Sequence, residues 1–388
     1  MADAARLAGV VAAPPAPMEP IVSTSAAEER VSVASQWQLM WWRFRKHKLA
    51  MAGALVVILF YAVVVFADFL AYADPEVSDA QRGLIAPQGI QWFDEGQFRP
   101  HVFALKGRRD PLTFKRVYAP DPDTKLPITF FAQGFDYKIF GFIPANRHLF
   151  GVDGATAEES LFLLGTDQQG RDQWSRLIYG TRISLTIGLV SVALSLFLGV
   201  ALGGVSGFYG GPLDTVIQRV IEILRSIPTI PLWMGLAAAM PPDWSVLQVY
   251  FTITIIISLI GWTELARVVR GKFLSLREED FVMAAELCGC SQARIIFIHM
   301  VPLFLSHIIA ATTLALPAMI ISETSLSFLG LGLRPPAISW GVLLQQAQNV
   351  QTVAISSWLL MPAVPVIIII LAFNFLGDGL RDAADPYN

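Results

Sequence analysis

The acidic and basic side chains that could carry out chemistry lie close together at few places in this sequence. The densest group is Asp167, Arg171 and Asp172, within the segment Gly165-Thr166-Asp167-Gln168-Gln169-Gly170-Arg171-Asp172. Carboxylates beside a guanidinium group could in principle move a proton or hold a metal ion. Their offsets of four and five residues, with Gly170 between them, are more typical of a turn that leads into a helix. We therefore predict a loop without a catalytic role.

The two cysteines, Cys288 and Cys290, stand in C-x-C spacing. They are too close in sequence for an ordinary disulfide framework. A single C-x-C without a neighbouring cysteine or histidine is also a poor zinc site. We predict two reduced thiols on a cytoplasmic loop and no metal site.

The sequence contains no phosphate-binding loop of the type G-x-x-x-x-G-K-[ST]. The nearest match is Gly271-Lys272, but Phe273 follows it and Ala266 replaces the first glycine. The motifs H-E-x-x-H and G-x-S-x-G are also missing. We therefore expect a non-catalytic protein without a cofactor, which does not hydrolyse ATP itself.

The composition of the 388 residues is that of a membrane protein. Hydrophobic residues make up 54% of the chain and charged residues 15%, whereas about 25% of a soluble domain is charged. The charges are therefore too few to cover a surface exposed to water. The net charge of −3 also provides no basic field that would attract nucleic acid.

Six stretches are long and apolar enough to cross a bilayer. A span needs about 20 mostly apolar residues, and its backbone must be helical because hydrocarbon offers no hydrogen bonds. The stretch 216–240 is less uniformly apolar than the other five, because charged residues fall in its first half. The predicted spans are Leu49–Ala67, Ile183–Phe208, Val216–Met240, Trp244–Thr263, Ile295–Ser322 and Ile355–Leu376. The predicted fold class is an all-α polytopic membrane protein with six transmembrane helices.

Lysine and arginine in the short loops predict the orientation, because cytoplasmic loops carry more of them. Basic residues cluster at 43–48 and at 267–294, whereas the loop Pro241–Asp243 has none. Both termini should therefore be cytoplasmic. This divides the chain into a cytoplasmic N-terminal tail (1–42), a first transmembrane helix (43–71), an extracytoplasmic insertion between helices 1 and 2 (72–164) and a five-helix core (165–388) with a cytoplasmic loop at 271–302.

The insertion 72–164 is rich in proline, aspartate, arginine and aromatic residues. Ile128–Phe131 and Lys138–Phe142 are typical of strands or extended loops between turns. About 90 residues suffice for a small ordered cap but are marginal for an independent core. The insertion is either a long connector or part of a docking surface for an external partner.

The cytoplasmic loop predicts a helix over Lys272–Cys288, which Gly289 ends, followed by a second helix capped by Ser291. Small or apolar residues recur in it at helical spacing: Phe281, Ala284, Ala285 and Cys288. The small alanines leave room for another protein surface to approach. A short amphipathic helix of this kind is a plausible partner contact.

Charged residues at membrane depth indicate function or internal pairing, since they are costly there. Glu264 and Arg267 are three residues apart and are expected to pair on one helix face. Glu323 precedes a glycine-rich stretch that contains Ser325, Phe328 and Gly330 and resembles a re-entrant or gate segment. Glu323 lies either on a transport pathway or in a structural ion pair.

The sequence resembles a known family. Ala284-Ala285-x-x-x-Gly289, nine further residues and then His299-Met300-Val301-Pro302 resemble the EAA loop of ABC-importer permeases. Met283, His299 and Val301 depart from that pattern. Other segments resemble the second permease of the oligopeptide, dipeptide and nickel branch: Leu164–Asp172, Tyr179–Leu185, Arg267–Gly271, Ser325–Gly332 and Asn374–Asp382. The resemblance covers Leu164–Asp385 and the opening Arg43–Phe69.

The resemblance implies one permease subunit of a binding-protein-dependent importer in a bacterial inner membrane. A homologous second permease would supply the other half of the pore, and two cytoplasmic ATPase subunits would bind ATP and magnesium. The region Phe281–Gly289, which includes Glu286, would be the coupling helix. An external solute-binding protein would deliver substrate at the face of Asp167 and Gly330.

Several alternatives remain at this point. Within the family, oligopeptides compete with oligosaccharides or opines, and the insertion is longer than in common peptide permeases. A membrane-embedded enzyme would use Asp167, Arg171 and Asp172. A self-sufficient channel or ion-coupled transporter would be supported by inverted repeats, which we do not find.

Overall fold

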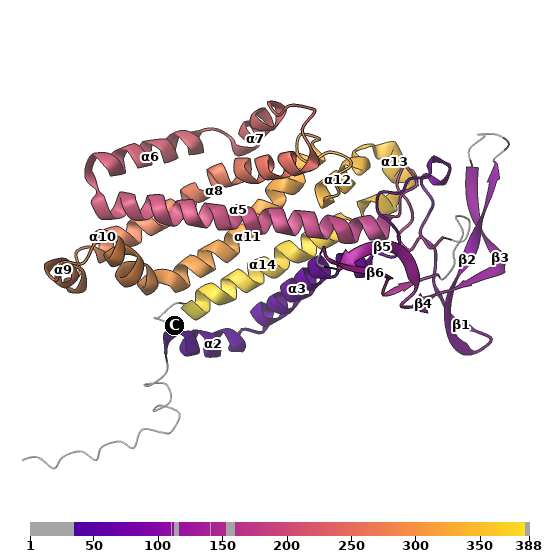
Figure 1. Ribbon diagram of the computed structural model, residues 1–388, viewed down its shortest axis with the longest axis horizontal. Coiled ribbons are helices and arrows are strands. Elements are labelled where there is room, and N and C mark those ends of the chain that lie inside the picture. Colours follow the sequence, from indigo (N-terminus) through magenta and orange to yellow (C-terminus); the bar gives the residue numbers. More distant parts are fainter. Residues whose placement is uncertain (1–34, 110, 112–115, 140, 153–159, 385–388) are drawn as a thin grey trace, which may run out of the picture.

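The computed structural model describes residues 35–109, 111, 116–139, 141–152 and 160–384. Long helices lie side by side in one elongated bundle, and the β-strands project from one of its ends (Figure 1). The predicted N-terminal tail lies outside the described residues up to position 34. The part of it that is described begins a helix, α2 (Gln36–Lys46), which Ser35 caps.

Five helical stretches of the described chain are long and apolar enough to span a membrane. They are α3 (Lys48–Val65), α5 (Gln173–Tyr209), α8 (Val246–Leu276), the stretch Gln292–Phe328 and the stretch Ser357–Ala384. The stretch Gln292–Phe328 combines α10 (Gln292–Arg294), a π-helical segment η3 (Ile295–Met300), a 3-10 segment η4 (Val301–Phe304) and α11 (Leu305–Phe328). The last stretch combines η6 (Ser357–Leu360) and α14 (Ala363–Ala384).

The predicted helix Val216–Met240 is broken. It consists of α6 (Gly211–Ser226) and α7 (Thr229–Ala238), which meet at an angle of 87°. The break follows from Pro228, because a proline disfavours helical backbone at the preceding residue and has no N–H to donate. Ile227 accordingly has extended backbone angles. The described chain has six spans only if this bent pair counts as one.

Shorter elements connect the spans. They are α4 (Ala67–Leu70), η1 (Ala80–Arg82), α9 (Asp280–Leu287), α12 (Trp340–Gln345), η5 (Gln346–Gln348) and α13 (Val350–Ile355). Helix α9 lies at the end of the bundle opposite the strands, as do α2 and the C-terminal end of α14 (Figure 1).

The described residues of the insertion form three small antiparallel sheets, so the all-α class describes the bundle but not the whole chain. One sheet joins β1 (Gln91–Asp94), β2 (Gln97–Arg109) and β3 (Arg116–Pro127). The other sheets pair β4 (Thr129–Phe130) with β7 (Phe150–Gly151) and β5 (Gln133–Ile139) with β6 (Ile143–Arg147). The predicted strand Ile128–Phe131 overlaps β4, and Lys138–Phe142 covers the turn between β5 and β6. Open sheet edges are possible here because this part lies outside the apolar spans.

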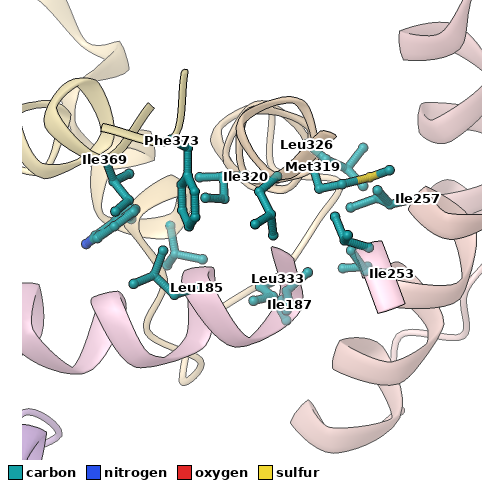
Figure 2. Packing of buried hydrophobic residues seen from close by; sticks show 14 of the residues in the cluster. Leu185, Ile187, Ile253, Ile257, Met319, Ile320, Leu326, Leu333, Ile369 and Phe373 are labelled. Carbon is teal, nitrogen blue, oxygen red and sulfur yellow. The ribbon is translucent and has the colours of Figure 1, made fainter. Parts of the chain in front are cut away.

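Apolar side chains from several helices meet at the centre of the bundle. Leu185 and Ile187 of α5 face Ile320 of α11, with Ile253 of α8 and Phe373 of α14 on either side (Figure 2). All five are at most 2% exposed. This core holds the helices that position the polar groups described below.

Glycines let α5 and α8 approach closely. A Cβ atom placed on Gly203 would lie 2.5 Å from the carbonyl oxygen of Ala266, and one on Gly207 would lie 2.7 Å from that of Arg270. Small residues at such contacts allow close backbone packing between membrane helices. The α5–α8 contact therefore depends on glycine at these positions.

We predict that Gly203→Ala destabilises the protein by about 1–3 kcal/mol, the usual cost of overpacking. The measurement is the thermal unfolding midpoint of the purified protein. Gly235→Ala in α7 is the matched control, because a Cβ atom there would meet nothing within 4 Å. An unfolding midpoint for Gly203→Ala equal to that of the control would contradict the packing argument.

Candidate functional site

Glu323 in α11 is fully buried and is held by hydroxyl groups. Ser184 Oγ of α5 donates to its Oε2 atom at 3.0 Å, and Ser327 Oγ donates to its Oε1 atom at 2.9 Å. Thr324 Oγ1 lies at 3.4 Å from Oε2. A buried carboxylate needs such partners, because hydrocarbon supplies none. Among the described residues Glu323 has no ion pair, and its partners within this chain are hydroxyl groups.

The same hydroxyls bind the chain that follows α11. Ser184 Oγ accepts a hydrogen bond from the Trp340 backbone N–H at 3.1 Å, and Ser327 Oγ accepts one from Leu333 N–H at 3.1 Å. Gly341 packs so closely that a Cβ atom on it would lie 2.6 Å from Ser327 Cβ. Glu323 therefore connects α5, α11 and α12 through one polar cluster.

The other predicted gate residues lie at the end of α11. Ser325 and Phe328 are within the helix and half-buried, and Gly330 forms the turn after it with φ of +77°. A Cβ atom on Gly330 would also lie 2.7 Å from Gln345 Nε2. The stretch after Glu323 is thus first helix and then a turn, because Thr324–Phe328 continue the helical hydrogen bonds. The predicted re-entrant or gate segment therefore begins within the last turns of α11.

Asp167 and Arg171 form a buried turn that joins the insertion to the bundle. Arg171 donates to Asp167 Oδ2 from Nε at 2.7 Å and from Nη2 at 2.6 Å, and Gln346 Nε2 donates to the same oxygen at 3.2 Å. Asp167 is fully buried, and its backbone carbonyl accepts from Leu84 N–H. The predicted polar turn is confirmed. A partner that approached this face would contact the residues around Asp167 rather than its side chain.

Asp172 caps the first turn of α5. Its Oδ2 atom accepts from Ser175 N–H at 2.7 Å, and Tyr72 donates its hydroxyl to Oδ1 at 2.7 Å. Burial disfavours the charged carboxylate and raises the pKa of Asp172 from 3.8 to about 6, although these hydrogen bonds oppose the rise. Asp172 therefore positions α5 below the insertion.

A second polar contact, near the start of α5, was not predicted from the sequence. Asp68, just beyond the first span, accepts from Arg182 Nη2 at 2.7 Å and from the Tyr179 hydroxyl at 2.5 Å. Tyr179 and Arg182 were noted only as part of a family motif. The partner Asp68 is more than one hundred residues away in sequence, so no local pattern indicates the pair.

The predicted coupling segment is largely exposed. Helix α9 buries Val282, whereas Phe281, Ala284 and Glu286 are exposed and Ala285 is half-buried. The exposed fraction of Leu287 is 90%. An apolar side chain exposed to this degree on a short helix is a candidate contact for another protein.

The ends of α9 differ in part from the prediction. The predicted helix Lys272–Cys288 is two helices, because α8 ends at Leu276 and the extended backbone of Glu279 precedes α9. Gly289 does end α9 with φ of +75°, and Ser291 Oγ accepts from Arg294 N–H as predicted.

Glu264 does not pair with Arg267. It forms an ion pair with Arg225 of α6, 39 residues earlier in the chain. The helix-spacing argument failed here because α6 packs against α8 and brings a closer cation.

Comparison with known proteins identifies the family. The model described as "binding-protein-dependent transport system inner membrane component" matches residues 199–387, and the N-terminal transmembrane domain of oligopeptide transport permease C matches 35–87. The dipeptide transport system permease protein of Bacillus subtilis is 38% identical over 224 residues, which are 57% of this chain and 68% of that protein. This chain belongs to the family of binding-protein-dependent ABC-importer permeases.

Other similar proteins cover more of the chain or are solved structures. The oligopeptide transport system permease protein of Bacillus subtilis is 29% identical over 371 residues, 95% of this chain and 96% of that protein. The oligopeptide transport system permease protein of Haemophilus influenzae is 39% identical over 236 residues, which are 61% of this chain and 73% of that protein. An inward-facing structure of the MetNI methionine ABC transporter has a TM-score of 0.43 at 18% identity and covers 53% of this chain and 95% of that chain.

The permease is therefore a multi-pass inner-membrane subunit of an importer, and ATP hydrolysis belongs to separate subunits of such systems. The prediction of an ABC-importer permease from the EAA-like segment is confirmed. Permeases of this family work with further permease, ATPase and binding-protein subunits.

We predict a pH-dependent effect of Asp172→Asn on stability. Asp172 is neutral in both states below about pH 4, and between about pH 4 and 6 only the folded chain keeps its proton. Stability from this group is thus lost as the pH rises through that window, whereas asparagine stays neutral. The thermal unfolding midpoint of Asp172→Asn minus that of the wild type should therefore be more positive at about pH 7.5 than at about pH 4.5. A difference independent of pH would contradict this.

Proposed function

We propose that this permease forms half of the translocation pore of an importer of dipeptides or oligopeptides. The observation that carries the proposal is its similarity to an oligopeptide transport permease over 95% of this chain. That similarity extends across the insertion 72–164, whose length therefore no longer argues against a peptide substrate. Dipeptide and oligopeptide permeases are also the relatives at 38–39% identity.

We propose the predicted topology of six spans with both termini in the cytoplasm and an extracytoplasmic insertion. The bent pair α6–α7 would form the third span. The arrangement of the bundle supports this, because the start of α2, the end of α14 and α9 lie at one end and the strands at the other (Figure 1).

The proposed energy source is a pair of cytoplasmic ATPase subunits that bind ATP and magnesium, with α9 as the coupling helix. Its exposed residues Phe281, Ala284, Glu286 and Leu287 would contact a groove of one ATPase. The buried Val282 packs α9 onto the inner apolar cluster around Phe304 and Met300. A movement of the ATPase would therefore pass through α9 into the bundle and bias its inward and outward states.

At the opposite end, the insertion and the surface around Asp167 and Gly330 would receive the solute-binding protein. Glu323 would act beneath this surface, where its cluster connects α5, α11 and α12. Its role would be to hold the chain that follows α11 in place against α5 and α11. Trp340 and Leu333 of that chain are bound through the hydroxyls that Glu323 orients.

An oligosaccharide or opine is the alternative substrate class. The deciding experiment is ATP-dependent uptake by the reconstituted transporter with its binding protein, using tri-alanine and maltotriose as radiolabelled probes. Uptake of tri-alanine supports the peptide assignment. Uptake of maltotriose alone would overturn it.

We predict that Gly289→Leu lowers peptide uptake about tenfold or more, through weaker ATPase binding or uncoupled ATP hydrolysis. Leucine in a left-handed backbone conformation costs about 1–2 kcal/mol and would reshape the end of α9. Gly289→Asn is the control, since asparagine tolerates this conformation. Two quantities are measured for each variant: the amount of ATPase subunit that stays bound to the purified permease, and the rate of peptide uptake. Wild-type uptake by Gly289→Leu would count against the coupling role.

We predict that Glu323→Gln lowers the uptake rate about tenfold while the complex still assembles. The amide replaces one of the carboxyl oxygens beside Ser184 and Ser327 with an NH₂ group, which cannot accept their hydrogen bonds and itself needs an acceptor. Ser195→Ala is the control, because it removes a buried hydroxyl between α5 and α8 outside the cluster. Unchanged uptake by Glu323→Gln would remove Glu323 from the gate.

A further inference from the structure

Arg225 of α6 and Glu264 of α8 form an ion pair that remains exposed on the surface of this chain. The exposed side-chain fractions are 39% for Arg225 and 70% for Glu264. Arg219 and Glu222 form a second pair on α6 at 2.8 Å, with exposed fractions of 73% and 50%. Three of these four charges lie on α6 at intervals of three residues, and the fourth lies on α8.

On the proposed topology, in which α8 enters the hydrocarbon near Val246, the Arg225–Glu264 pair lies within the membrane. Helix α8 begins at Val246 after the outer loop, and Glu264 follows about 27 Å along the helix at 1.5 Å per residue. That is within the roughly 30 Å of the hydrocarbon, toward its inner side. Charged side chains at this depth face a bundle interior or a water-filled cavity rather than lipid. The surface that carries the pair must therefore face water or another protein.

Helix α6 has separate surfaces that support this orientation. Ile217 and Ile221 are buried against Trp262 of α8. Val216, Val220 and Ile223 form an exposed apolar stripe, which suits lipid. Arg225 projects from another side of the same helix and contacts Glu264 of α8. Only that side needs a polar environment.

From this arrangement, and resting on the proposed peptide importer, we propose that Arg225 and Glu264 line the translocation pathway and bind the charged termini of the peptide. A peptide with free ends carries one ammonium and one carboxylate group. Arg225 can bind the carboxylate through two parallel hydrogen bonds, and Glu264 can accept hydrogen bonds from the ammonium. The ion pair opens and each member receives a new partner of opposite charge, so the bound peptide replaces the attraction that the pair gives up.

This exchange selects zwitterionic substrates. An uncharged oligosaccharide offers no opposite charge to either residue, so it would not replace the attraction that is lost when the ion pair opens. The pair would therefore contribute to the choice of substrate within the pore, after the binding protein has released it.

The test uses the complete transporter with its binding protein in proteoliposomes and tri-alanine as the probe. The double variant Arg225→Gln/Glu264→Gln removes both charges without leaving one unpaired. We expect uptake at least about tenfold below wild type, with normal assembly and ATPase activity. The control Ser195→Ala removes a buried hydroxyl between α5 and α8 and should retain wild-type uptake.

A second variant separates substrate contact from simple structural pairing. The charge swap Arg225→Glu/Glu264→Arg preserves the mutual attraction but reverses the order of charges along the pathway. Uptake that stays low in the swap supports the proposal, whereas recovery to the wild-type rate shows a structural ion pair and overturns it. Wild-type uptake by the neutral double variant overturns it as well. If the wild-type transporter itself does not carry tri-alanine, the proposed peptide function fails instead.

A labelling experiment tests the location independently of activity. Single cysteines replace Arg225, Glu264 or Val220 in the assembled transporter with Cys288 and Cys290 changed to serine. A membrane-impermeant maleimide should label positions 225 and 264 from the water phase, and tri-alanine should slow that labelling. Position 220 should stay unlabelled. Labelling of 220 but not of 225 and 264 would overturn the assignment.

Discussion

The bilayer interior provides no hydrogen-bond partner, and every other feature of this permease depends on that constraint. A backbone in hydrocarbon must satisfy its own N–H and C=O groups, so the apolar stretches are helical. The strands occur in the insertion, where sheet edges can meet water. The same constraint explains why Glu323, fully buried in α11, receives hydroxyl hydrogen bonds from three side chains. It also explains why exposed charges at membrane depth mark a surface that is not lipid.

Helix α5 is the element on which the arrangement of the others depends. Its outer end is held by Asp172 and by the contact of Arg182 with Asp68, and its middle supplies Ser184 to the Glu323 cluster. Further along, glycines bring it into close contact with α8. One long helix thus connects the insertion 72–164, the proposed gate and the half of the bundle that carries α9. A displacement of one end of α5 can therefore move the groups at its other end.

The two ends of the molecule serve different proposed roles. The outer end has buried polar turns and a folded insertion, which suit a surface that must keep its shape for docking. The inner end carries α9, a short helix whose apolar side chains are mostly exposed rather than packed within this chain. Between these ends lie the Arg225–Glu264 pair and the Glu323 cluster, one exposed and one enclosed. The exposed pair is suited to contact a solute, and the enclosed cluster is suited to hold helices in register.

The sequence alone determined the membrane class, the approximate spans, the family and the exposed helix near Ala284 and Gly289, because these depend on composition and short-range spacing. Tertiary structure decided what packing brings together. Local spacing paired Glu264 with Arg267, but the packing of α6 on α8 gave it Arg225 instead. No pattern along the chain could place Ser184 beside Glu323, 139 residues later, or Asp68 beside Arg182. Hydrogen bonds and ion pairs act over a few ångströms in space, and only the folded bundle sets those distances.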